Sequence, residues 1–196
     1  MNYRDGALEA VNGLALASGV TYAVLAARRN RLCWIAGAVS SACAAILSAL
    51  NKLPMQAGLQ IFYVGMSVYG WWSWKRHSSE GQLMIGLWPL GWHLGAALVL
   101  TFLSLASAYW LRPADVAAWP LLDSVSTWFS LLATWLAARA KLENWLYWIV
   151  INALMVFLFY AQKVWGMALL SVFLVVIAGA GFIGWRRRLQ AQGAPA

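Results

Sequence analysis

The segment "ATWLAARAKLENW", residues 133–145, is matched by "YAVLAARRNRLCW", residues 22–34. Both contain Leu-Ala-Ala-Arg, and in both a tryptophan follows six positions after the arginine, at Trp34 and Trp145. The two tryptophans are 111 positions apart. Self-similarity at a fixed distance indicates an internal repeat, so the first question is which structural unit is repeated.

The composition shows that lipid surrounds most of the chain. Its 196 residues are 63% hydrophobic and only 10% charged, whereas soluble domains are about 45–50% apolar and about 25% charged. A membrane span takes about 20 apolar residues, and its backbone must be hydrogen-bonded within the segment. Because the apolar runs lack barrel-like alternation, we expect helices.

Seven apolar runs are long enough to cross a membrane. They cover residues 7–27, 32–50, 56–74, 83–108, 117–138, 144–161 and 164–185. We expect the first run to stay in the mature protein, because only Arg4 precedes it and a signal peptide has a basic start. The sequence therefore predicts an all-α integral membrane protein with seven transmembrane helices.

The basic residues predict the orientation. Loops after odd-numbered runs hold ten of the fourteen lysines and arginines: Arg28, Arg29, Arg31, Lys75, Arg76, Arg139, Lys141, Arg186, Arg187 and Arg188. Excess positive charge marks the cytoplasmic side, so we expect the N-terminus outside and the C-terminus inside. These clusters account for the net charge of +8 without a basic stripe, so nucleic acid is not expected as a partner.

A second pair of segments extends the repeat. "VYGWWSW", 68–74, and "GFIGWRRR", 181–188, both place Gly-Trp at the cytoplasmic end of a third helix, now 114 positions apart. The change in spacing predicts a three-residue insertion between the second and third helices. We expect a first three-helix repeat at 1–77, a linker helix and loops at 78–116, a second repeat at 117–188 and a cytoplasmic tail at 189–196.

This 3+1+3 order has a functional implication. One intervening helix makes the two three-helix repeats run in the same direction. Parallel repeats are a known transporter plan, with the substrate near the bilayer midplane at the repeat interface. The order therefore favours a transporter over a membrane enzyme.

The segments "LQIFYVGMSVYGWWSWKR", 59–76, and "ENWLYWIVIN", 143–152, resemble the PnuC family of vitamin-precursor transporters. The second carries a Trp-x-x-Trp-x-x-x-Asn pattern, and the resemblance extends over nearly the whole chain. It implies a fold similar to full-length SWEET sugar transporters and homotrimers. It also implies facilitated diffusion of nicotinamide riboside across a bacterial-type inner membrane, with alternating access, and phosphorylation inside the cell that keeps uptake running.

Trp145, Trp148 and Asn152 share one face of the sixth predicted helix. Trp145 lies where an interfacial aromatic belt is expected. Trp148 and Asn152 lie deeper, and a tryptophan face attracts a flat cation such as a pyridinium. Asn152 either bonds a neighbouring helix or holds an amide or ribose hydroxyl. The family pattern favours substrate binding for all three.

Two more groups of polar residues are candidates for the substrate site. Gln60 and Tyr63 lie one turn apart on the third helix, where an unpartnered glutamine would be costly. Asp123, expected to be the one carboxylate inside a span, either attracts a cationic substrate, couples protons or caps the helix begun by Pro120. Thr127 is one turn below Asp123.

Other polar residues are interpreted structurally. His93 has no acidic residue at helical spacing within its own helix, so we expect it to make a lone polar contact. We expect Glu143 to cap the sixth helix. Five glycines, Gly65, Gly70, Gly179, Gly181 and Gly184, are expected to permit close helix approach. No catalytic triad, phosphate loop or metal cluster is visible, so the sequence predicts neither catalytic residues nor a cofactor.

Three functions remain open. The first is transport of nicotinamide riboside, a flat cation, with lipid as the other partner. The second keeps the fold and changes the substrate to thiamin or another nucleoside-like vitamin, because an aromatic cage suits both cations. The third is a membrane enzyme or a structural subunit.

Overall fold

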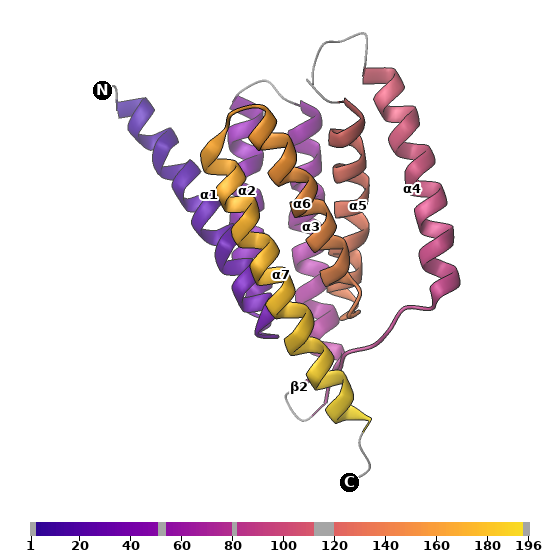
Figure 1. The fold of residues 1–196 in the computed structure, drawn as a ribbon. Helices are drawn as coiled ribbons and strands as arrows, with labels where there is room; N and C mark the ends of the chain where they lie inside the picture. Colours follow the sequence, from indigo (N-terminus) through magenta and orange to yellow (C-terminus); the bar gives the residue numbers. More distant parts are fainter. Residues whose placement is uncertain (1–2, 51–53, 80–81, 112–119, 194–196) are drawn as a thin grey trace. The chain divides into compact units, whose positions relative to one another are not determined.

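The computed structural model describes residues 3–50, 54–79, 82–111 and 120–193. Over this part of the chain, seven helices account for nearly all regular structure (Figure 1). They are α1 (Tyr3–Ala27), α2 (Cys33–Leu50), α3 (Pro54–Arg76), α4 (Leu90–Leu111), α5 (Pro120–Ala138), α6 (Asn144–Ala161) and α7 (Trp165–Gln192). The chain forms two compact units, Met1–Met84 and Ile85–Ala196.

The helices have surfaces suited to lipid. Among the described residues, every helix except α3 is long and apolar enough to cross a membrane. Leu98 of α4 is 75% exposed and Leu169 of α7 is 71% exposed. Large apolar side chains on so many helix faces would be costly in water, whereas lipid covers them without cost. The predicted all-α membrane fold is therefore confirmed.

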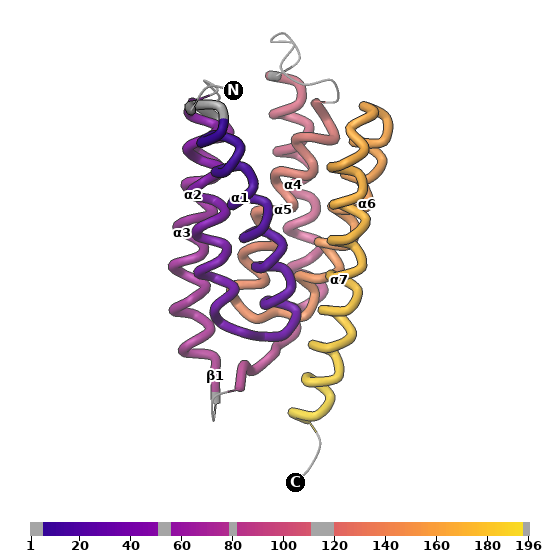
Figure 2. Tube along the Cα trace, turned by 90° about the vertical axis from the view of Figure 1, so that its left-hand side faces the viewer, coloured from indigo at the N-terminus to yellow at the C-terminus, as the bar shows by residue number. Residues whose placement is uncertain are grey.

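In the first unit, α2 packs against both α1 and α3 (Figure 2). Trp34 at the start of α2 is 2% exposed and contacts Trp74 of α3 edge-to-face, with ring centroids 5.5 Å apart. Its ring also lies against Gly70, where a Cβ atom would collide with it. The glycine thus lets α3 approach the buried indole.

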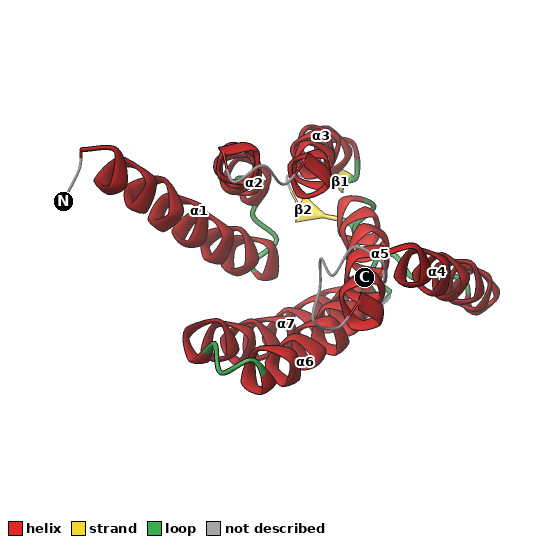
Figure 3. Ribbon diagram, turned by 90° about the horizontal axis from the view of Figure 1, so that it is seen from above, coloured by secondary structure: helices red, strands yellow, loops and turns green. Residues whose placement is uncertain are grey.

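In the second unit, α5 packs between α4 and α6, and α6 packs against α7 (Figure 3). Trp145 at the start of α6 is 4% exposed and contacts Trp185 of α7 edge-to-face, with centroids 5.6 Å apart. A Cβ atom at Gly181 would lie 2.8 Å from the Trp145 ring. The contacts of Trp34 are therefore reproduced in this unit.

These contacts correct the predicted alignment of the repeats. Trp74 and Gly70 correspond to Trp185 and Gly181 at the same 111-residue spacing that relates Trp34 to Trp145. The starts of α2 and α6, and those of α3 and α7, follow the same spacing. The predicted three-residue insertion is therefore wrong. The prediction aligned the dipeptide Gly70-Trp71 with Gly184-Trp185, but these residues do not make equivalent contacts.

The turns that precede α2 and α6 also agree. Arg29 and Ala140, again 111 positions apart, adopt positive φ angles of 58° and 52°. Each then donates its backbone N–H to a carbonyl three residues back, Ala26 O at 2.9 Å and Ala137 O at 3.0 Å. Such left-handed residues end helices by satisfying their last carbonyls. The two units are therefore similar even in the left-handed backbone conformation of these turns.

The fourth helix begins later than predicted, at Leu90 rather than at residue 83. A short hairpin, β1 (Ser78–Ser79) paired with β2 (Gln82–Leu83), precedes an extended segment. In this segment Gly86 donates its N–H to Ala140 O at 3.1 Å and accepts from Leu142 N at 3.0 Å. Its backbone is thus hydrogen-bonded to the α5–α6 turn and is not available for a helix.

Helix α1 begins at Tyr3, four residues before its predicted start, and the remaining helix ends except that of α7 lie within three residues of the prediction. The expected bounds of α2 and α6 hold within a residue. Helix α7 continues to Gln192, so residues 189–192 of the predicted tail are helical. Gln192 accepts a hydrogen bond from Ile85 N at 3.3 Å through its side-chain oxygen. This contact anchors the last turn of α7 to the segment before α4.

Candidate functional site

Trp145, Trp148 and Asn152 lie near the start of α6 as predicted, with different degrees of burial. Trp145 is buried against Trp185 and Gly181, and its indole N–H has no hydrogen-bond partner in the described structure. Trp148 is half-buried. The contacts of Trp145 are shared by Trp34, which points to packing in both units, while Trp148 is replaced in the first unit by Gly37.

Asn152 lies one turn deeper and is 8% exposed. Its side-chain Nδ2 donates to Trp148 O at 2.7 Å within the same helix. This hydrogen bond uses one donor of an amide that also carries a second N–H and a carbonyl oxygen. It holds the side chain against the backbone of the turn that carries Trp148. The Asn152 side chain and the Trp148 backbone are therefore held together within one turn of α6.

The neighbouring helix α5 presents a polar row to the interior. Ser124, Ser126, Ser130 and Thr134 are all buried. Ser126 and Thr134 donate their hydroxyls to backbone carbonyls of their own helix, whereas Ser124 Oγ has no partner among the described residues. Thr127 is half-buried beside this row.

Asp123 lies in the first turn of α5, closer to the helix end than predicted, and it is exposed. It is also not the one carboxylate within a span, because the candidate span of α1 begins at Gly6 and includes the exposed Glu9. The exposure of Asp123 agrees with a position near the membrane surface. Ser126 Oγ donates to Asp123 O at 2.8 Å, so the recorded contact is with its backbone.

Three of the predicted residues of the second unit lie at successive depths along α5 and α6. Helices α5 and α6 are antiparallel neighbours joined by a short turn. At 1.5 Å per residue, Trp148 lies about 6 Å from this turn, Asn152 about 12 Å, and Thr127 about 16 Å. Asn152 and Thr127 are therefore at similar depth, and Trp148 lies closer to the α5–α6 turn.

Gln60 and Tyr63 belong to the first unit, where both are half-buried on α3. Ser67, one turn further, is 6% exposed and donates through Oγ to Tyr63 O at 2.9 Å. Ser67 Oγ would also lie 3.2 Å from a Cβ atom at Gly37. The seven predicted binding residues thus fall into two groups, two on α3 and five on α5 and α6.

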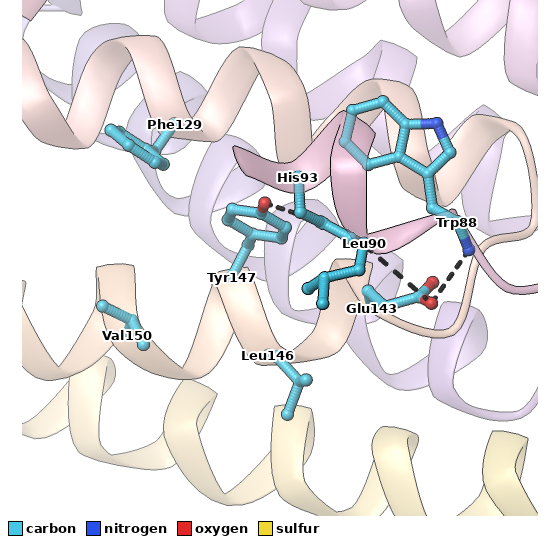
Figure 4. Close-up of a pocket in the computed structure, with 8 residues that line it drawn as sticks. All are labelled: Trp88, Leu90, His93, Phe129, Glu143, Leu146, Tyr147 and Val150. Atoms are coloured by element: carbon cyan, nitrogen blue, oxygen red, sulfur yellow. Dashed lines mark hydrogen bonds and ion pairs between the residues drawn. The ribbon is translucent and has the colours of Figure 1, made fainter. Parts of the chain in front are cut away.

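His93 of α4 makes the expected polar contact with Tyr147 of α6, and it also lies near Glu143, which helical spacing within α4 did not predict. Its Nδ1 is 2.9 Å from the Tyr147 hydroxyl, and its Nε2 is 4.0 Å from Glu143 Oε1 (Figure 4). Glu143 does not cap α6 with its side chain. Its Oε1 accepts from Trp88 N at 2.9 Å instead.

Sequence reasoning missed this polar cluster because its members are some 50 positions apart. Helical spacing within α4 gives His93 no acidic neighbour. One signal was available, since the predicted orientation places the start of the fourth helix and the start of the sixth on the same membrane side. Polar residues at those two helix starts are natural contact partners.

Among the predicted glycine approaches, Gly70 and Gly181 are confirmed by their tryptophan contacts. Gly65 and Gly179 are different, because a Cβ atom at either would have no neighbour within 4 Å. Trp74 is 1% exposed, and the guanidinium of Arg76 stacks 3.6 Å from the ring centroid of Trp72.

Long lipid-compatible helices, with a polar row on α5 and an aromatic-amide pair on α6, define a multi-pass helical membrane protein. Residues 9–187 match the family described as nicotinamide mononucleotide transporters, and the chain belongs to this family. Its relatives are transporters, a class without enzymatic activity.

Two similar proteins are the nicotinamide riboside transporters PnuC of Escherichia coli and Shigella flexneri. Each is 29% identical, over 70% of this chain and 69% of the relative. The fold is similar to the crystal structure of the vitamin B3 transporter PnuC, with a TM-score of 0.73 at 20% identity. That similarity covers 92% of this chain and 82% of the other.

Proposed function

We propose that the protein carries nicotinamide riboside across the membrane by facilitated diffusion with alternating access. The observation that carries this proposal is the family match over residues 9–187, together with relatives described as nicotinamide riboside transporters. The half-buried Trp148 and the adjacent Asn152 supply chemistry suited to that substrate. Uptake continues because phosphorylation inside the cell removes the free riboside.

The charges of the predicted site favour the riboside over the mononucleotide. Its members are Trp145, Trp148, Asn152, Gln60, Tyr63, Thr127 and Asp123. They include one acidic residue and no basic one. A phosphate group that leaves water needs cationic or backbone N–H partners. A pyridinium cation with hydroxyls and an amide needs aromatic faces and neutral hydrogen-bonding groups, which this set provides.

In this proposal Trp148 stacks on the pyridinium ring, and Asn152 bonds the carboxamide. Gln60 and Tyr63 hold the ribose hydroxyls, with Thr127 at a depth similar to Asn152. Trp145 supports the wall of the site, because it is buried against Gly181 and Trp185. Asp123, exposed in the first turn of α5, attracts the cation from the outer solution.

We propose that the membrane is a bacterial-type inner membrane with the C-terminus in the cytoplasm. Cation–aromatic contacts support the assignment of the basic helix ends to one interface. Arg31 lies 4.1 Å above the Trp71 ring and Arg139 lies 5.7 Å from the centroid of Trp135. Aromatic and basic residues at helix ends are typical of an interface. A homotrimer is proposed by resemblance to the family.

Transport by purified protein in liposomes tests the function. We expect labelled nicotinamide riboside to enter and to equilibrate, with no entry of the mononucleotide. Trp148→Leu should raise the KM about three- to thirty-fold, the range of a desolvated cation–aromatic contact of about 0.7–2 kcal/mol. Trp148→Phe, which keeps an aromatic face, should fall between wild type and Trp148→Leu.

The matched control is Trp165→Phe, an exposed tryptophan at the other end of the helical hairpin α6–α7. Its transport should equal that of wild type. Entry of thiamin but not of the riboside, with no mutual competition, would replace the substrate by the alternative vitamin. Absence of any vitamin flux in folded protein would favour a subunit role.

A further inference from the structure

A pocket of about 510 Å³ in the second unit is separate from the proposed transport site. It is lined by three helices and by the segment before α4. The lining residues are Trp88, Leu90, His93, Phe129, Glu143, Leu146, Tyr147 and Val150 (Figure 4). None of the predicted substrate residues is among them, so this pocket needs its own explanation.

One end of the pocket holds an acceptor that lacks a donor. Glu143 Oε1 accepts from Trp88 N, but Oε2 is buried and has no hydrogen-bond partner among the residues that the structure describes. His93 Nε2 is likewise buried without a hydrogen bond, 4.0 Å from the carboxylate. A buried carboxylate oxygen without a donor is costly. A ligand that brings N–H groups would remove this cost.

Aromatic rings surround the same end. Trp88 meets the His93 ring edge-on with centroids 4.7 Å apart, and Tyr147 lies beside His93 and Phe129. Lysine and arginine are missing from the lining. The nearby Lys141 donates its ammonium to Leu87 O at 3.1 Å. Carboxylate and aromatic faces together select a cation over an anion.

Away from the carboxylate, the lining of the pocket is largely apolar and exposed on the sides of the helices. Leu90, Leu146 and Val150 are 73%, 45% and 59% exposed on candidate membrane spans. Val150 is seven residues beyond Glu143 along α6, which corresponds to about 10 Å. Figure 4 shows Val150 and Phe129 at one end and Glu143 with the Trp88 backbone at the other. The pocket therefore changes from polar to apolar along the helix axis.

We propose that this pocket binds an aminophospholipid from the surrounding membrane leaflet. The ethanolamine ammonium donates to Glu143 and lies against the aromatic rings, and the first acyl methylenes lie along Leu146, Val150 and Phe129. A water-soluble cation would leave the apolar half of the pocket unfilled. An amphiphile that arrives through the exposed mouth satisfies both halves, and its binding links α4 to α6.

Native mass spectrometry of the protein from bilayers of defined composition tests the proposal. From an equal mixture, we expect wild-type protein to retain phosphatidylethanolamine over phosphatidylcholine and phosphatidylglycerol. The choline headgroup has no N–H to donate, and the glycerol headgroup brings no cation. Glu143→Gln keeps an acceptor for Trp88 N and removes the charge, so it should lower retention of phosphatidylethanolamine about tenfold. Val150→Trp fills the apolar half and should abolish retention.

The matched control is Glu9→Gln, which makes the same charge change at an exposed residue of α1. It should retain lipid as wild type does. Gel filtration and thermal unfolding of each variant identify misfolded protein. Transport of nicotinamide riboside is measured separately in phosphatidylethanolamine-free liposomes, so a failure of the proposed function is distinguished from a failure of the lipid site.

Three results would overturn the lipid assignment. The first is equal retention of phosphatidylethanolamine by wild type and Glu143→Gln. The second is displacement of the lipid by nicotinamide riboside, which would make the pocket a second vitamin site. The third is cross-linking of Leu146→Cys to another copy of the chain regardless of lipid, which would make a neighbouring copy the occupant.

Discussion

At the scale of single residues, the two buried tryptophans show how a glycine is selected by its neighbour. The Trp34 ring fills the space in which a side chain at position 70 would lie, and Trp145 does the same at Gly181. Membrane helices gain little from excluding water, so close packing contributes much of their association. Each Trp–Gly contact therefore stabilises its helix pair through dispersion over a large ring.

Gly70→Ala tests this role. The added methyl group would collide with the Trp34 ring, which is held between Tyr22 and Trp74 and has little room to move. Overpacking of this kind costs about 1–3 kcal/mol. We expect a lower unfolding temperature of the purified protein in detergent, measured by tryptophan fluorescence.

The control for this prediction is Gly65→Ala on the same helix, where a Cβ atom meets nothing within 4 Å. Its unfolding temperature should equal or exceed that of wild type, because alanine restricts the unfolded chain and favours helix. Equal unfolding temperatures for Gly70→Ala and Gly65→Ala would show that the contact with Trp34 does not limit packing.

At the scale of elements, the segment before α4 is attached to the α5–α6 turn by several hydrogen bonds. Gly86 exchanges two with the backbone on either side of Lys141, and Leu87 O accepts from the Lys141 ammonium. Trp88 N adds the contact to Glu143. The start of helix α4 is consequently held at the turn between α5 and α6.

Two substitutions of Gly86 distinguish the loss of its backbone hydrogen bond from crowding by an added side chain. Gly86→Pro removes the N–H that bonds Ala140 O and should lower stability by about 1–3 kcal/mol. Gly86→Ala keeps this N–H, and its methyl group meets only the movable end of Lys141. We expect a clear fall in unfolding temperature for the proline variant and a small change for the alanine variant. A comparable fall in both would attribute the effect to crowding.

This attachment also shows where sequence reasoning reached its limit. The bounds of α2 and α6 could be predicted because charged turns close each apolar run. The start of α4 could not, since the apolar run begins at Leu83 while the backbone of Gly86 pairs with residues more than 50 positions away. Spacing along one helix placed Trp148 and Asn152 together. The same reasoning could not find His93 beside Glu143, which is a contact between helices.

At the scale of the whole molecule, facilitated diffusion predicts that the substrate gradient alone drives transport. Without a kinase inside liposomes, labelled nicotinamide riboside should reach equal concentrations on both sides, with or without an imposed pH gradient. With a riboside kinase and ATP enclosed, the label should accumulate. Asp123→Asn should reduce the entry rate only a few-fold, because an exposed carboxylate is screened by salt.

Accumulation driven by a pH gradient, and lost in Asp123→Asn, would contradict this expectation. It would assign proton coupling to the carboxylate instead. Glu9→Gln serves as the control at the other exposed carboxylate of a candidate span. Its equilibrium distribution of label should equal that of wild type.

The constant spacing between equivalent contacts has an evolutionary consequence. Contacts that recur at a spacing of 111 residues, with no insertion between them, are what duplication and fusion of one ancestral gene would leave. An ancestor with three crossings ends on the opposite side from its start. A direct fusion would therefore have inverted the second copy. In the predicted 3+1+3 order, one added helix would let the descendant copy keep its parent's orientation, and the largely exposed surface of α4 suits a late-joining segment.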